Sequence, residues 1–197
     1  MNRVTCIRAI VIGVALSLVL AAAATADERF PVRSEDNTSQ PLESRVTAID
    51  TVLGPLGNRL ERIGLPPSPI DPELEGALVG LAAEAHRLAV DSDCFAAGVP
   101  IGTEVGATTI ADEDAFASDA STSGLANQAS AIATILTIAD GRLVRIATDS
   151  FQADPGLPPS PVRDALALVE ADAFALAVGA AIIGGFELPP NPICPAT

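Results

Sequence analysis

The chain has 197 residues, among them 11 Arg, no Lys and 25 Asp or Glu, which gives a formal net charge of −14. It has no Trp or Tyr and only one His and three Cys. An excess of negative charge disfavours nucleic acid and anionic membrane surfaces as partners. Scarce Cys and His argue against a zinc site and weaken most catalytic interpretations. The length allows one domain with a real core.

Residues 1–26 have the pattern of an export signal. Arg3 and Arg8 precede an apolar run, and Ala24-Thr25-Ala26 fits the small-residue cleavage pattern. Cleavage there would leave nine arginines and 25 carboxylates, a balance of −16. The alternative is a retained anchor, but the apolar run has only the length of a signal segment, so we expect no membrane span after processing. The sequence therefore predicts a secreted or extracellular protein.

The mature chain would keep two cysteines, Cys94 and Cys194. An even pair in an exported chain predicts a disulfide, and the alternative is two free thiols. Residues 27–41 are polar with two prolines, and we expect a flexible acidic arm. Asn37 begins an Asn-Thr-Ser sequence, which is a possible glycosylation site in a eukaryotic source.

An apolar residue recurs every three or four positions over 42–63, as on one face of a helix. The same spacing returns over 125–146, offset by 83 positions, and the two segments align without a gap. The first apolar seam comprises Leu42, Val46, Ile49, Leu53, Leu56, Leu60 and Ile63. The second comprises Leu125, Ala129, Ile132, Leu136, Ala139, Leu143 and Ile146. The repeat suggests an internal duplication.

A Gly-Leu-Pro-Pro-Ser-Pro block follows each segment, at 64–69 and 156–161, and a second helical pattern follows each block. We expect Asp71 and Ser160 to cap these helices, with a proline at the first helical position of each. The third seam comprises Leu74, Leu78, Leu81, Ala85 and Leu88. The fourth comprises Val162, Leu166, Val169, Ala173, Leu176, Ala180 and Ile183. The Pro-rich blocks suit rigid helix connectors better than a polyproline ligand.

These patterns predict an all-α fold, a four-helix bundle made of two repeated helical hairpins and tied by one disulfide. The expected single domain spans 42–197, with a hairpin at 42–94, a linker at 95–123 and a second hairpin at 124–197. Each hairpin alone would leave its apolar seams exposed, so we expect the two to share one core.

The sequence offers little chemistry, and we expect no enzyme, no metal site and no cofactor. His86 is the only histidine, and no nucleophile, phosphate-binding or dinucleotide motif is present. The acidic groups at 91–93 and 112–114 lack the glycine and terminal glutamate of a calcium loop, which favours solvated carboxylates. An acid–base pair remains open because carboxylates are plentiful.

The most unusual segment is 173–186, which has fourteen residues without a charge. It is too short to span a bilayer, so it is either the central helix of the bundle or an apolar binding surface. The residues of a possible apolar contact face are Phe174, Leu176, Val178, Ile182, Ile183 and Phe186.

The order of elements resembles the fungal hydrophobic surface-binding protein A family. The resemblance lies in a first helix with an apolar seam at 42–63, a second helix at 74–88 and an acidic stretch at 112–115. A long third helix at 125–146, followed by Phe151, and an apolar last helix at 162–183 complete it. It implies a secreted, non-catalytic protein that adsorbs to hydrophobic surfaces or coats a cell wall, and it identifies no functional residues. We therefore expect binding to a hydrophobic surface, a lipid or a cell wall. The alternative is a secreted partner-binding or inhibitory bundle, and the sequence leaves the oligomeric state open.

Overall fold

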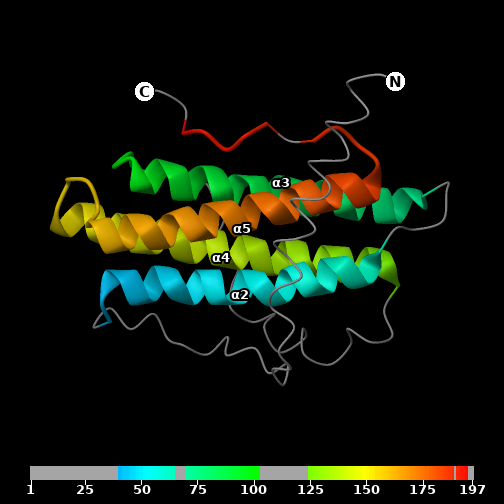
Figure 1. The fold of residues 1–197 in the computed structure, drawn as a ribbon, viewed down its shortest axis with the longest axis horizontal. Coiled ribbons are helices and arrows are strands. Elements are labelled where there is room, and N and C mark those ends of the chain that lie inside the picture. Colours follow the sequence, from blue (N-terminus) through cyan, green and yellow to red (C-terminus); the bar gives the residue numbers. More distant parts are fainter. Residues whose placement is uncertain (1–39, 65–69, 103–123, 189, 195–197) are drawn as a thin grey trace, which may run out of the picture. The chain divides into compact units, whose positions relative to one another are not determined.

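The computed structural model describes residues 40–64, 70–102, 124–188 and 190–194. These residues form four α-helices and no strand (Figure 1). The helices are α2 (Leu42–Ile63), α3 (Pro72–Ala96), α4 (Leu125–Ala153) and α5 (Ser160–Gly184). The predicted all-α class and four-helix bundle are confirmed. The expected signal at 1–26, Asn37 and the acidic stretch at 112–114 lie outside the described residues.

Each helix buries the apolar seam that the sequence predicts. The exceptions lie at seam ends, where Leu42 and Ile183 are half-buried and Leu125 is exposed. The largest fully buried side chains are Phe95, Leu53, Leu56, Leu78, Leu81, Leu88, Ile132, Leu136, Leu143, Ile146, Leu166 and Val46. Because these side chains come from all four helices, the bundle has one shared core.

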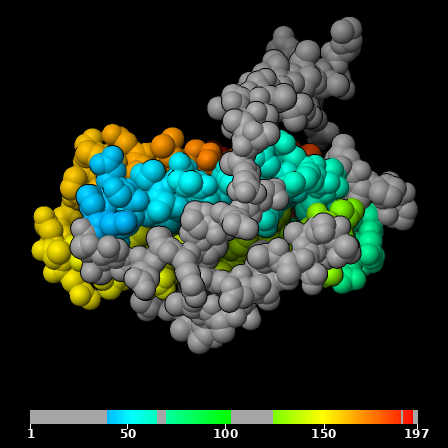
Figure 2. Space-filling model, turned by 90° about the horizontal axis from the view of Figure 1, so that it is seen from below, coloured from blue at the N-terminus to red at the C-terminus, as the bar shows by residue number. Residues whose placement is uncertain are grey.

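The two helices of each predicted hairpin, α2 with α3 and α4 with α5, do not form packed pairs. α3 packs against α4 and α5, and α2 packs against the same two helices. Figure 2, seen from the α2 side, shows α2 with α5 along one flank and α4 along the other. α2 and α3 therefore stand at diagonal corners of the bundle, and so do α4 and α5. The repeated hairpins expected from the sequence are not confirmed, since each helix is packed mainly on helices of the other half.

The helix directions agree with this arrangement. The colours of Figure 1 show α2 and α5 running one way and α3 and α4 running the other. Neighbouring helices lie 8–10 Å apart, so a diagonal is about 14 Å. The segments joining α2 to α3 and α4 to α5 can reach that far, because an extended residue spans about 3.3 Å. α3 and α4 run in the same direction, so the end of α3 and the start of α4 lie at opposite ends of the bundle.

Of the two helix caps predicted from the sequence, the one at Asp71 is confirmed and the one at Ser160 is not. The Asp71 carboxylate accepts a hydrogen bond from the Glu73 backbone N–H at 3.2 Å, and Pro72 opens α3 as predicted. The predicted cap at Ser160 is wrong, because Ser160 is already the first helical residue and Pro159 takes the cap position without a side-chain hydrogen bond. Pro161 has no N–H, so this helix start has one fewer donor to satisfy.

The end of α3 extends beyond the predicted boundary at 94. Phe95 lies in its last turn, is fully buried, and has its ring centroid 5.6 Å from that of Phe151 in α4. The last turns of the parallel helices α3 and α4 are thus held together by an aromatic contact.

The predicted disulfide is present and fixes the C-terminal segment to α3. Cys94 and Cys194 are bonded, with their Cα atoms 4.7 Å apart. The Cys194 backbone N–H donates to the Asp93 carboxylate at 2.7 Å, and the His86 Nε2 lies 2.9 Å from the Pro190 carbonyl oxygen. The segment after α5 therefore returns along α3, as Figure 1 shows.

Candidate functional site

The predicted apolar contact face of the last helix is divided between the core and the surface. Leu176 is buried at 4% exposure, whereas Ile182 is 48% exposed. Phe174, Val178, Ile183 and Phe186 are half-buried. Five of these residues point to different sides of α5, and Phe186 lies beyond its end.

A different set of residues forms an apolar surface on α5. Positions spaced by three, four or seven residues share a face of a helix, and a row of apolar residues runs along the outer side of α5, next to the exposed Asp172. We call this face the outer stripe of α5, and it comprises Leu168, Ala171, Ala175, Val178 and Ile182. Four of the five residues are exposed, with Leu168 at 58%, and Val178 is half-buried. The stripe is about 21 Å long at the helical rise of 1.5 Å per residue.

The opposite face of α5 lies in the core of the bundle. This explains why residues 173–184 are apolar on the inner side as well as the outer side. The inner side packs against α2 and α3, and it does so closely where side chains are small. A Cβ atom at Gly179 would lie 3.1 Å from Leu60 Cδ2, so α2 and α5 approach tightly at that level. In the described residues, α5 alone is long and apolar enough to cross a membrane by length and composition. A core helix meets the same criteria, and the inner face of α5 is core.

Ionisable groups lie beside the stripe. Burial, followed by the nearby Asp172, raises the pKa of Asp50 on α2. Burial alone raises the pKa of Asp172 on α5, and burial and Asp93 raise that of Glu170. From Ala173 to the end of α5 no ionisable residue occurs, so this half of the stripe is uncharged.

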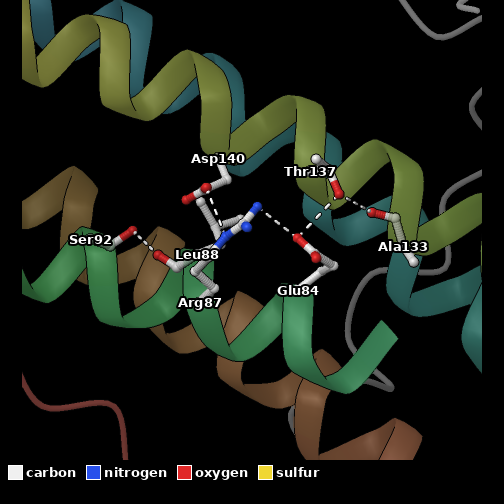
Figure 3. A network of polar contacts seen from close by, with 7 residues as sticks. All are labelled: Glu84, Arg87, Leu88, Ser92, Ala133, Thr137 and Asp140. Carbon is white, nitrogen blue, oxygen red and sulfur yellow. Dashed lines mark hydrogen bonds and ion pairs between the residues drawn. The ribbon is translucent and has the colours of Figure 1, made fainter. Parts of the chain in front are cut away.

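The second candidate feature is a polar cluster between α3 and α4, drawn in Figure 3. Asp140 on α4 is fully buried. Its Oδ2 atom lies 3.0 Å from Nε of Arg87 on α3, and Nη2 of Arg87 lies 2.7 Å from Oε2 of Glu84. The Thr137 hydroxyl lies 3.1 Å from the same Glu84 oxygen and 3.1 Å from the Ala133 carbonyl.

The Arg87–Asp140 contact is an ion pair and not an aligned hydrogen bond. Neither Asp140 oxygen has a hydrogen-bond partner of good geometry, although both are buried. Burial, more than any other cause, raises the pKa of Asp140 to about 7. The Asp91 carboxylate raises it further by its negative charge and by accepting a hydrogen bond from the protonated form of Asp140. Arg87 opposes this shift. The pKa of Asp91 is also raised, chiefly by burial.

This cluster can hold a proton, but it does not resemble a metal site. Over the described ranges, no group of three or more His, Cys, Asp or Glu side chains is arranged to bind a metal ion. The single histidine is part of the C-terminal attachment, with its ring centroid 6.4 Å from that of Phe174. The cluster could not be predicted from the sequence, because its members come from two helices far apart in the chain.

Comparison with protein-family models, with curated proteins and with solved structures finds no match for this chain. The outer stripe of α5 and the α3–α4 cluster are therefore interpreted from their own geometry.

Proposed function

We propose that this chain is an exported, non-catalytic helical protein that binds hydrophobic surfaces or lipids, including as a coat on a cell wall. The outer stripe of α5 is the observation that carries the proposal. Leu168 and Ile182 are about half exposed at its two ends, and Ala171, Ala175 and Val178 lie between them, with the exposed Asp172 at the edge. The signal pattern at 1–26 and the Cys94–Cys194 disulfide support export to an oxidising compartment.

The physical basis of the proposed binding is the hydrophobic effect. Burial of a fully exposed Leu or Ile side chain contributes about 1.5–3 kcal/mol, so each half-exposed end of the stripe would contribute about 1 kcal/mol. The strong negative charge of the chain argues against electrostatic adsorption to anionic surfaces. A closed bundle could bind in this way, since the stripe already faces outward.

The non-catalytic part of the proposal is supported by where the titratable groups lie. Asp140 is the most strongly shifted carboxyl described, and it is enclosed between α3 and α4. A catalytic acid or base must reach a substrate proton within about 3 Å. The cluster therefore suits a structural task better than chemistry on a bound molecule.

Charge placed in the stripe tests the proposal. The double variant Leu168→Glu/Ile182→Glu is expected to adsorb roughly 30-fold less tightly than the wild type to alkyl-coated beads, because about 2 kcal/mol of apolar contact is lost and two charges must be kept in water. Depletion of the protein from dilute solution measures adsorption, and circular dichroism checks that the variants are folded.

The matched control is Leu125→Glu/Ile193→Glu, which makes the same chemical changes at exposed positions on α4 and in the C-terminal segment. This control is expected to adsorb like the wild type. An equal loss in both double variants would show an effect of net charge alone and would contradict a role for the stripe. The partner-binding alternative predicts a saturable protein partner and adsorption that neither variant changes.

A further inference from the structure

The interface between α3 and α4 differs from the rest of the core because it contains ionisable groups. The described core is otherwise aliphatic or aromatic, apart from Cys94 and Ser92. The Ser92 hydroxyl bonds to the Leu88 carbonyl within α3, at 2.8 Å, and does not cross to α4. Asp140 is the one buried carboxylate among the described residues, and it contacts Arg87 across the interface.

The charges in this interface do not balance. Glu84, Asp91 and Asp140 bring three carboxylates to the single guanidinium of Arg87, which is divided between Glu84 and Asp140. One positive charge cannot neutralise three negative ones, and water cannot solvate the buried Asp140 carboxyl as it does the partly exposed Arg87 and Glu84 side chains. A proton on one carboxyl reduces the net charge of the four groups from −2 to −1, and Asp140 is the carboxyl that is fully enclosed.

No charge from another described helix alters this balance. α4 also packs on α2, and the Arg45–Asp149 ion pair sets an antiparallel register that brings residues around Gly54 opposite Asp140. The nearest acidic residue of α2 in that register is Asp50, one turn away, and it is not among the groups that shift Asp140. All the charged groups that act on Asp140 come from α3.

We propose that Glu84, Arg87, Asp91 and Asp140 form a proton-operated latch between α3 and α4. With a proton on Asp140, the net charge of the four groups is −1 and no fully buried carboxyl is ionised, so the interface stays closed. When Asp140 releases its proton, a buried negative charge faces two others, and the contact between the helices is weakened. The protein is thereby built to be more resistant to opening at mildly acidic pH than at neutral or alkaline pH.

The direction of the effect follows from the two states of the chain. The pKa of Asp140 is about 7 in the folded protein, against an ordinary value of 3.8. Between those values the folded protein keeps a proton that the unfolded chain has lost. The stability from this group is therefore fully present below about pH 4 and is lost as the pH rises to about 7. One such proton changes the unfolding constant by at most about tenfold per pH unit.

Urea unfolding between pH 5 and pH 8, followed by circular dichroism, tests the latch. The wild-type unfolding constant is expected to rise by up to about tenfold per pH unit from pH 5 to pH 7. Asp140→Asn is expected to lose most of that rise, because its amide keeps the shape without titrating. Asp164→Asn, at an exposed position on α5, is expected to keep it.

The comparison between variants is decisive because Asp50, Glu170 and Asp172 also have raised pKa values. An unchanged rise in Asp140→Asn would overturn the proposal, as would a wild-type protein with no rise. If Asp140→Asn fails to fold, the titration midpoint of Asp140 is measured in the wild type instead. The NMR chemical shift of its carboxyl carbon reports that midpoint. A midpoint near pH 7 supports the latch, and one near pH 4 overturns it. No surface is present in these measurements, so their outcome is independent of the proposed surface binding.

Discussion

Replacement of both Cys94 and Cys194 with alanine is expected to lower the free energy of unfolding by about 4 kcal/mol while leaving the folded helix content unchanged. The bridge closes a loop of about 100 residues, and the chain-entropy estimate for such a loop is about 4.7 kcal/mol. The effect arises mainly in the unfolded chain, which the bridge restricts. Alanine is the appropriate replacement because Cys94 is buried, and a serine hydroxyl there would need a partner.

Urea unfolding of the oxidised wild type and the double-alanine variant measures this difference. The variant should also show a larger change of free energy per molar urea, because its unfolded chain exposes more surface. A loss below about 1 kcal/mol would mean that the return of the chain to α3 does not depend on the bridge. The single hydrogen bonds at Asp93 and His86 would then be holding the C-terminal segment.

Phe95→Ala is expected to lower the free energy of unfolding by about 3–5 kcal/mol, the range for removing a buried aromatic ring. Phe95 is fully buried at the end of α3, directly after the bridged Cys94, and it contacts Phe151 on α4. Its loss would leave a cavity where the last turns of two parallel helices meet. Calorimetric or urea unfolding measures the loss.

Phe151→Ala and the double variant complete the comparison. Phe151 is only half-buried, so its removal should have a smaller effect than that of Phe95. The double variant is expected to lose about 0.5–1.5 kcal/mol less than the sum of the single losses, the usual size of an aromatic pair contribution. A loss below about 1 kcal/mol for Phe95→Ala would show that this end of the bundle is not well packed.

The apolar seams could be predicted because they depend only on local spacing. A helix with an apolar residue at every third or fourth position must bury that face, whatever its neighbour. Phe95 was expected at the start of the linker, because the glycines and polar residues after Gly98 end the periodic pattern close by. The disulfide could be predicted from an even cysteine count and an export signal.

The arrangement of the helices could not be predicted in the same way. Seam spacing is equally compatible with packed hairpins and with the two helices of each half on a diagonal, since both arrangements bury the same faces. Only non-local contacts such as Arg45–Asp149 and Arg87–Asp140 distinguish the two. Asp140 lies directly after the seam residue Ala139, so local spacing gave no reason to expect its burial against α3.

The outer stripe of α5 shows a related limit. The sequence identified 173–186 as unusually apolar, but composition does not say which residues meet the core. The neighbours of α5 decide that Leu176 is buried and Ile182 is exposed. Leu168 lies outside the uncharged segment, so composition did not predict it as part of the contact face. It is seven residues from Ala175 and fourteen from Ile182, on the same face of the helix.

The central claim, that this protein binds hydrophobic surfaces, is tested most directly with the unmodified chain lacking residues 1–26. It would be produced in an oxidising host and incubated in dilute solution with alkyl-coated beads, beside a soluble helical protein of matched charge. The account predicts clearly greater depletion of this protein than of the control, with the helical circular dichroism signal retained on the beads. Depletion no greater than that of the control would contradict surface binding.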